Sequence, residues 1–259
     1  MPERWIAEAE QLTPSGAPGT MSGVGPPRAI CHVTVSRPGS FDAMHRVLTD
    51  KMAEPHVLYD WATDRLGQYF ALDRSARALR RGTRDVSCNK VGAACIQIEF
   101  CSMPDGFTRY WTPGPNFRAL MRAIASWGIT PQFVARANTS AGDNVRQTWE
   151  TYLATGGWWG HCHVPENDHW DPGPIDQAAF FARAVEITQG DDMTPAELTA
   201  ALKASAPAFA AAIRDALLSA PIAAGESDAP ASLEWAIYRT QSILMRMDTR
   251  IAEALEHRQ

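Results

Sequence analysis

The segment 160–173 constrains this chain more than any other, because it places three histidines, a cysteine and several carboxylates between two glycines. Its last three residues, Asp171, Pro172 and Gly173, form a rigid turn. Proline fixes its own φ and holds the preceding residue extended, and glycine can adopt a positive φ. Histidine-rich loops are more often solvated than metal-binding. A carboxylate held this rigidly, ten positions after His161, nevertheless suits a divalent cation whose ligands converge from one side.

Composition limits the size of the fold and the kinds of partner that this chain can have. A chain of 259 residues, 45% hydrophobic and 20% charged, can bury a substantial core in one domain or in one domain with a small appendage. The net charge of −5 and the lack of a dense Lys/Arg run argue against nucleic acid as the main partner. The five cysteines have no CxxC spacing, which argues against a disulfide framework and against a cysteine-rich zinc finger.

The sequence also bears on where the protein acts. No apolar run is long enough to cross a bilayer, so we expect no membrane insertion. The first residues, MPERW, lack the basic start and the apolar stretch of a secretory signal. We therefore expect a product made in the cytoplasm, which another agent must release if its substrate lies outside the cell.

Two β-patterned runs carry candidate site residues. The run 28–35 is rich in β-branched residues and predicts a buried strand with His32 near its end. A lone histidine on such a strand is more often a core residue than a ligand. The run 95–101 alternates and places Glu99 on the face opposite Ile96, Ile98 and Phe100. A glutamate there is costly unless it is paired, exposed or near a cation, so Glu99 is a candidate base. An edge-strand carboxylate in water would give the same pattern.

Other patterns predict the remaining elements. Residues 56–60 and 66–72 are typical of a hairpin, and we interpret His45 and His56 as structural. Residues 73–90 are basic and are either a solvated loop or a substrate-binding border of a groove. Helical periodicity and terminal signals predict four helices. These are a helix capped by Ser40, and helices over 115–127, 144–155 and 175–188.

We divide the chain into an N-terminal arm over 1–26, a main domain over 27–189 and a C-terminal helical region over 190–259. The C-terminal region is Ala-rich and acidic, and Thr194 to Glu197 form a capping box with proline at the first helical position. Its last helix shows about three heptads of apolar spacing. This spacing is compatible with a helical hairpin, which we favour slightly, or with self-association.

Three pieces of the sequence together resemble a known family. They are His32-Val33-Thr34, the strand Ile96 to Phe100 with Glu99, and Gly160-His161 followed ten positions later by Asp171-Pro172-Gly173. In this order they resemble the zinc-dependent N-acetylmuramoyl-L-alanine amidases of the type-2 amidase family, which are related in fold to peptidoglycan recognition proteins. The match covers roughly residues 27–185. The ending Asn-Asp-His-Trp-Asp-Pro-Gly resembles that of endolysins from phages of actinobacteria.

The resemblance implies a fold and a site. The fold is α/β, with a mixed central sheet flanked by helices. The implied zinc ligands are His32, His161 and Asp171, with Glu99 as the catalytic base. His163 could replace His161 as a ligand, but the spacing to Asp171 favours His161. The implied substrate is peptidoglycan, and the implied bond is the amide between N-acetylmuramic acid and L-alanine of the stem peptide.

Two departures from the family pattern bear on mechanism. A lysine common two residues before the aspartate is His169 here, which can stabilise the oxyanion only as a proton or hydrogen-bond donor. A tyrosine that some phage members carry before the histidine of the second strand is Pro55 here, so Glu99 must act alone as the base. Trp158, Trp159 and Trp170 either line the substrate groove or pack in the core.

Two alternatives to a lytic enzyme remain at this stage. One is a binding module without catalysis on the same fold, since fold does not fix function. Binding-only relatives tend to lose a zinc ligand, whereas this chain keeps all three candidates. The other is a cytosolic amidase that recycles soluble wall fragments. An added C-terminal region argues mildly against it, since a scavenger of small fragments needs no further module.

Overall fold

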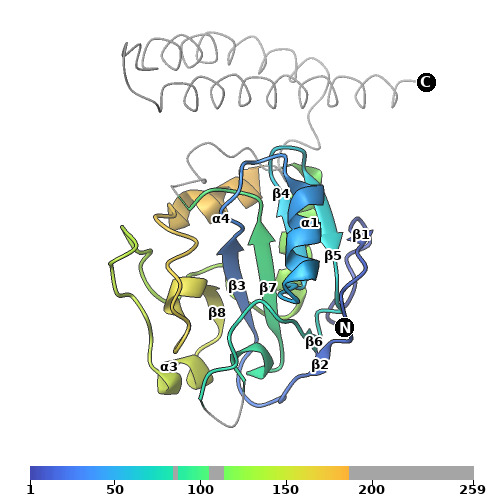
Figure 1. Ribbon diagram of the computed structural model, residues 1–259. Helices are drawn as coiled ribbons and strands as arrows, with labels where there is room; N and C mark the ends of the chain where they lie inside the picture. The colour runs from blue at the N-terminus through green and yellow to red at the C-terminus, as the bar shows by residue number, and fades with distance from the viewer. Residues whose placement is uncertain (84–86, 105–113, 187–259) are drawn as a thin grey trace, which may run out of the picture. The chain divides into compact units, whose positions relative to one another are not determined.

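The computed structural model describes residues 1–83, 87–104 and 114–186, with the backbone alone for 182–186 (Figure 1). Its centre is a six-stranded sheet with the order β1-β5-β4-β7-β3-β8. The strands are β1 (Glu10–Gln11), β3 (Arg28–Val33), β4 (Val57–Asp60), β5 (Arg65–Gln68), β7 (Cys95–Phe100) and β8 (Gly157–Gly160). A separate two-stranded sheet joins β2 (Gly19–Thr20) to β6 (Arg74–Ser75).

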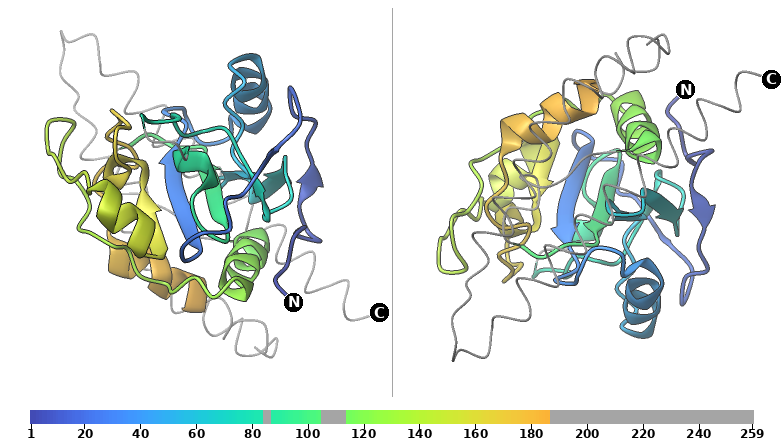
Figure 2. Two further views of the ribbon diagram at one scale, coloured as in Figure 1. Left: turned by 90° about the horizontal axis from the view of Figure 1, so that it is seen from below. Right: turned by 90° about the horizontal axis from the view of Figure 1, so that it is seen from above.

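The central sheet is mixed. β3 pairs in parallel with β7 and with β8, and β4 pairs in parallel with β7. β4 and β5 form the predicted antiparallel hairpin. Helix α1 (Phe41–Asp50) covers one face of the sheet, and α2 (Pro115–Ser126) and α4 (Gln177–Glu186) cover the other (Figure 2). The predicted α/β class, with a mixed central sheet flanked by helices, is confirmed.

Strands β3 and β7 lie inside the sheet, and all six residues of each are buried. Parallel strands covered on both faces are expected to be buried throughout. On one face, Phe100 packs against Phe117 of α2 and Phe180 of α4. Glu99 points to the opposite face, because side chains alternate along a strand. Glu99 is therefore not an edge-strand carboxylate in water, and it needs a partner within the protein.

One local prediction is wrong, and another is confirmed for its position only. The helix expected over 144–155 begins only at Trp149, because Thr148 caps it through a hydrogen bond from Thr151 N–H to its hydroxyl. This is α3 (Trp149–Ala154). Ser40 occupies the N-cap position of α1, as predicted, but its side chain makes no capping hydrogen bond; its hydroxyl pairs with that of Ser36 at 2.8 Å instead.

The N-terminal arm joins the edge of the sheet. β1 pairs in parallel with β5, and Ile6 and Leu12 are buried. The side-chain oxygen of Gln68 accepts the Ile6 N–H at 2.8 Å, and its amide nitrogen donates to the Arg4 carbonyl at 2.9 Å. The arm is therefore held by backbone pairing and by a buried amide, in addition to apolar contacts.

Contacts between Cα atoms divide the chain into Met1–Thr188 and Gln189–Gln259. The expected C-terminal helical region over 190–259 lies outside the described residues, and its helices and self-association stay predictions. Within the described part, no helix is long and apolar enough to cross a membrane. All five cysteines are free and buried.

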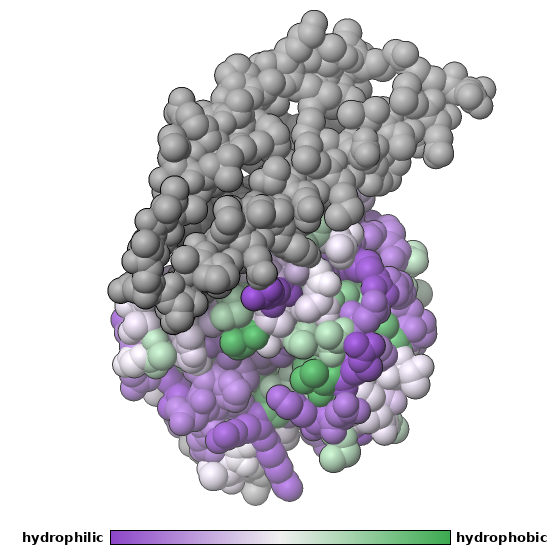
Figure 3. Space-filling model, turned by 45° about the horizontal axis from the view of Figure 1, so that its top comes forward, coloured by the Kyte–Doolittle hydropathy of each residue, from purple (hydrophilic) through white to green (hydrophobic). Residues whose placement is uncertain are grey.

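The carboxyl ends of β3 and β7 point to the top of Figure 1, and Figure 3 turns this end towards the viewer. Hydrophobic side chains gather there, with hydrophilic ones around them. Val35 follows β3 and is 58% exposed, and Met103 follows β7 and is 46% exposed. Val35 also has a φ of 53°, which is rare for a β-branched residue. The strand ends therefore lead into an irregular, partly apolar surface.

His45 and His56 are structural, as predicted. His45 Nδ1 lies 2.8 Å from the Tyr69 hydroxyl. His56 is fully buried; its Nδ1 accepts the Gln97 N–H at 3.0 Å, and its Nε2 donates to the Arg74 carbonyl at 2.8 Å. The imidazole of His56 thus links β7 to β6.

Burial lowers the pKa of His56 to about 4, against 6.5 for an ordinary histidine. A folded-state pKa below the unfolded value contributes stability that is fully present above pH 6.5 and is lost as the pH falls towards 4. The contribution is on the order of 3 kcal/mol. We expect an NMR titration to find His56 neutral down to about pH 4, with the free energy of unfolding falling over the same interval. A titration midpoint near 6.5 would contradict this account.

Candidate metal centre

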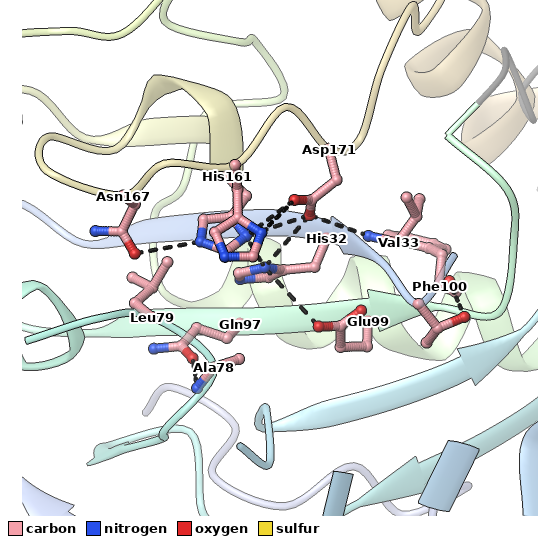
Figure 4. Close-up of polar contacts among 12 residues, drawn as sticks. His32, Val33, Ala78, Leu79, Gln97, Glu99, Phe100, His161, Asn167 and Asp171 are labelled. Carbon is pink, nitrogen blue, oxygen red and sulfur yellow. Dashed lines mark hydrogen bonds and ion pairs between the residues drawn. The ribbon is translucent and has the colours of Figure 1, made fainter. Parts of the chain in front are cut away.

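The pairing of β3 with β7 brings His32 beside Glu99. The two residues are directly opposite each other in the parallel register, so their side chains share a face. His32 Nδ1 lies 3.9 Å from Glu99 Oε1 (Figure 4). His32 is 1% exposed and Glu99 is 8% exposed. The two sequence motifs that carry these residues therefore meet in the interior of the protein.

The pairing of β3 with β8 brings in His161. The register ends with Cys31 opposite Gly160, the last residue of β8, and the residue that follows each of them is a histidine. The chain turns there into the short 3-10 helix η3 (His161–His163). The Nδ1 atoms of His32 and His161 lie 3.0 Å apart. The central strand β3 thus places His32 between the two other motifs.

Asp171 completes the cluster. Its Oδ1 lies 3.1 Å from His161 Nδ1, and its Oδ2 lies 3.7 Å from His32 Nδ1. One ligand atom from each of these residues lies within 4.8 Å of the others, and all three residues are buried. The structure therefore brings together the three residues predicted as metal ligands, and Figure 4 shows Glu99 beside them.

Backbone contacts hold the turn that carries Asp171. The Asp171 carbonyl accepts the Cys162 N–H at 2.8 Å, and the Asp171 carboxylate accepts the Val33 N–H at 3.4 Å. The Asp171–Pro172 peptide is cis, and Gly173 has a φ of 80°. A Cβ at Gly173 would overlap the Pro104 carbonyl oxygen, so this position needs glycine for its conformation and for space.

Burial and charge set the protonation of the cluster. Burial, and then repulsion from His161, lower the pKa of His32 well below its usual value, so its imidazole is neutral. Burial alone would raise the pKa of Asp171, but attraction to His161 and hydrogen bonds from His161 and His169 outweigh it and lower the pKa. Neutral imidazoles and ionised carboxylates are the forms that bind metal.

Glu99 is electrostatically distinct from Asp171. Burial, and then the nearby charge of Asp171, raise the pKa of Glu99 well above its usual value. Among the described residues, Glu99 Oε2 has no hydrogen-bond partner, and neither has His32 Nε2. Two carboxyl groups in one site whose pKa values are pushed apart suit different roles, one as a ligand and one as a base.

His169 lies at the open side of the cluster. Its ring stacks on that of His161 with 4.1 Å between centroids, and its Nδ1 lies 3.4 Å from Asp171 Oδ1. Its side chain is 47% exposed. His169 and Trp170 also line an open hollow of about 230 Å³ formed with the loop 141–146. A substrate approaching from solvent would therefore meet His169 before the buried ligands.

His163 is not part of the cluster. Its Nδ1 accepts the Gly160 N–H at 2.9 Å, and its Nε2 donates to the Arg136 carbonyl at 3.0 Å. Both ring nitrogens are thus used by the backbone, and His161 is the histidine that faces His32.

The tryptophans divide between core and surface. Trp158 and Trp159 are fully buried, against Phe180 at 5.2 Å and Tyr152 at 4.9 Å between ring centroids. They therefore pack in the core. Trp170 lines the hollow beside His169.

One buried residue near the cluster was given no role from the sequence, although it begins the ending Asn-Asp-His-Trp-Asp-Pro-Gly. Asn167 is fully buried, and its Oδ1 lies 3.2 Å from His161 Nε2. An asparagine in a polar loop carries no pattern that separates this position from a surface turn. The available signals were its place in the segment 160–173 and in that ending.

The donor set fits zinc. Two imidazoles and one carboxylate are a common protein set for catalytic zinc, and they leave a further position open. The three ligand atoms converge from a strand, from the residue after a neighbouring strand and from a rigid turn. We conclude that His32, His161 and Asp171 could hold a metal ion.

Comparisons with known proteins give distant structural matches only. No protein-family model matches the chain, and no curated protein matches it. A crystal structure of a selenomethionine AmpD derivative aligns with a TM-score of 0.43 and 17% identity, over 69% of this chain and 96% of that one. The Staphylococcus aureus hydrolase AmiA, in complex with its ligand, aligns with a TM-score of 0.40 and 12% identity, over 70% of this chain and 85% of that one. At these values the activity must be inferred from the residues of the site.

The requirement for glycine at position 173 can be tested by comparison with a second glycine of positive φ. Gly128 also has a positive φ, 73°, but a Cβ there would meet nothing within 4 Å. We expect Gly128→Ala to cost about 1–2 kcal/mol in the free energy of unfolding, from backbone strain alone. Gly173→Ala should cost roughly 2–4 kcal/mol, because overpacking against Pro104 is added. Urea unfolding of the metal-free proteins measures both, and equal costs would contradict the account of this turn.

Proposed function

We propose that the chain is a zinc-dependent N-acetylmuramoyl-L-alanine amidase. It hydrolyses the amide between the lactyl group of N-acetylmuramic acid and L-alanine of the stem peptide. One observation carries the proposal: ligand atoms of two histidines and an aspartate lie within 4.8 Å of one another, with the carboxyl group of Glu99 3.9 Å from His32. The second oxygen of that carboxyl group, Oε2, has no hydrogen-bond partner among the described residues. The sequence resemblance supplies the substrate.

His32, His161 and Asp171 would hold the zinc ion. Zinc, when bound, supplies a water of lowered pKa and polarises the scissile carbonyl. Glu99 takes the proton of the attacking water and passes it to the leaving nitrogen. Its carboxyl group is placed for both steps, because it lies on the face of β7 that carries the cluster, 3.9 Å from His32 Nδ1. The C–N bond breaks, and the products are a lactyl carboxylate and the free amino group of L-alanine.

His169 would donate a hydrogen bond to the oxyanion that forms on the scissile carbonyl. Its half-exposed ring at the open side of the cluster supports this role. The stacking on His161 and the contact with Asp171 limit where that ring can lie. Pre-positioned donors of this kind lower the barrier because they need no reorganisation during the reaction.

We further propose a lytic role on bacterial cell wall, of the phage endolysin type. The resemblance of the ending Asn-Asp-His-Trp-Asp-Pro-Gly supports it. In this role the protein is made in the host cytoplasm and reaches peptidoglycan after release by a partner that opens the membrane, or as part of a virion. Residues 190–259 would then serve wall binding or self-association.

The activity can be tested on purified actinobacterial peptidoglycan. We expect new amino groups of L-alanine and no new reducing ends, because the amide is cut and the glycan is not. The release should disappear with a chelator, return with zinc, and be absent from Asp171→Ala. Reducing ends would identify a glycosidase instead.

The same assay separates the alternatives. Wall binding without either product would favour a non-catalytic binding module. Amino-group release from soluble wall fragments but not from intact wall would favour a recycling amidase. Either result would overturn the lytic proposal.

The role of Glu99 can be distinguished experimentally from that of the proposed metal ligands. We expect Glu99→Gln to bind zinc with the parent stoichiometry and to lose roughly 10²–10⁴-fold in turnover, as for removal of a general base. Asp60→Asn is the matched control, since Asp60 is a second buried carboxyl group with a raised pKa, outside the cluster. Zinc content and amino-group release measure the two effects. A Glu99→Gln protein as active as the control would contradict the assignment.

A further inference from the structure

We propose that Asn167 is a positioning residue that holds His161 with its proton on Nε2, so that the lone pair of Nδ1 faces the cluster. The inference rests on the proposed zinc site. It assigns a role to the buried side-chain amide of Asn167. None of the hydrogen bonds described above joins this amide to Asp171, His32 or Glu99.

The orientation of the Asn167 amide is fixed by its neighbours. Oδ1 accepts the Arg80 N–H at 2.8 Å, and Nδ2 donates to the Pro165 carbonyl at 3.0 Å. A flipped amide would set two donors against each other at Arg80 and two acceptors at Pro165. The oxygen of Asn167 is therefore the atom that faces His161.

The location of the His161 proton follows from this orientation. His161 Nε2 lies 3.2 Å from Asn167 Oδ1, which can only accept a hydrogen bond. Nε2 must therefore carry the proton in the neutral ring, and Nδ1 is left with a lone pair. That Nδ1 is the atom 3.0 Å from His32 Nδ1 and 3.1 Å from Asp171 Oδ1. Figure 4 shows Asn167 on the side of His161 away from Asp171.

The other histidines near the cluster lack such a partner or are held differently. His32 Nε2 has no hydrogen-bond partner in the described part of the chain. His163 is oriented by the backbone, through Gly160 and Arg136. Asn167 is thus the side chain that orients the imidazole of His161, and it does so from the side of the ring away from Asp171. Partners of this kind typically change metal affinity 10–100-fold when they are removed.

Asn167 also connects His161 to the segment 74–83, which lies beside the cluster in Figure 4 at Ala78 and Leu79. Buried amides hold this segment at three points: Gln97 at Ala78, Asn89 at Leu79 and Asn167 at Arg80. Asn167 is the member of this set that also contacts a proposed metal ligand. Substitutions of Gln97 or Asn89 therefore offer controls, because they disturb the segment 74–83 without removing a contact of His161.

The experiment compares three variants of the full chain with the parent. Asn167→Leu removes the acceptor and keeps the number and branching of the side-chain heavy atoms. Asn167→Asp keeps an acceptor for His161 and Arg80. Asn89→Leu removes an anchor of the same segment at Leu79, away from His161. Nitrogen-15 NMR of the metal-free proteins reads the tautomer of His161, and competition with a chelator of known affinity reads zinc binding.

We expect the parent to hold His161 fully as the Nε2–H form. Asn167→Leu should populate both tautomers and bind zinc 10–100-fold more weakly. Asn167→Asp should restore the Nε2–H form of His161 and most of the affinity for zinc. Asn89→Leu should leave the tautomer of His161 unchanged and should bind zinc more tightly than Asn167→Leu does. An Nδ1–H form in the parent would overturn the proposal. So would an unchanged tautomer in Asn167→Leu, or an equal loss of affinity in Asn89→Leu.

The tautomer is measured without metal, so the inference can fail separately from the proposed function. A parent protein that does not bind zinc would refute the zinc amidase. The NMR result does not depend on zinc, and an Nδ1–H form of His161 in the parent would overturn the proposal even if Asn167→Leu did not fold.

Discussion

The parallel pairing of β3 with β7 on one side and β8 on the other is the constraint on which the site depends. It sets His32 opposite Glu99 and ends one residue before His161. A shift of one residue in either register would turn a side chain of the cluster to the opposite face of the sheet. The apolar contacts of Phe100 with α2 and α4 oppose such a shift, because they bury the other face of the same strand. The geometry of the site is therefore a consequence of core packing.

The cluster carries a cost that the rest of the fold offsets. Glu99 and His32 each bury a polar atom without a partner in the described chain, and two imidazoles meet through their Nδ1 atoms. Unpaired buried polar groups are unfavourable by about 1–3 kcal/mol each. Strain and unmet polar groups of this kind concentrate at functional sites. A cation bound by the lone pairs of the two Nδ1 atoms and of Asp171 would relieve the contact between the two imidazoles.

Much of this arrangement could be predicted from the sequence, because strands, hairpin and Asp-Pro-Gly turn each depend on local patterns. His32, Glu99, His161 and Asp171 were identified through the joint spacing of three motifs, since no single motif was specific. The start of α3 was missed because Asn144 and Val145 fit a helical pattern although Thr148 caps the helix. Asn167 was missed because its role depends on Arg80 and His161, which only the folded chain brings to it.

The most direct test of the central claim is X-ray absorption at the zinc edge on the zinc-loaded protein. The account predicts one zinc per chain with nitrogen and oxygen ligands alone, at about 2.0–2.2 Å, from His32, His161 and Asp171 and a further light atom. Sulfur in the first shell, at about 2.3 Å, would contradict it, because it would place a cysteine such as Cys162 on the metal. So would zinc content that is unchanged in Asp171→Ala.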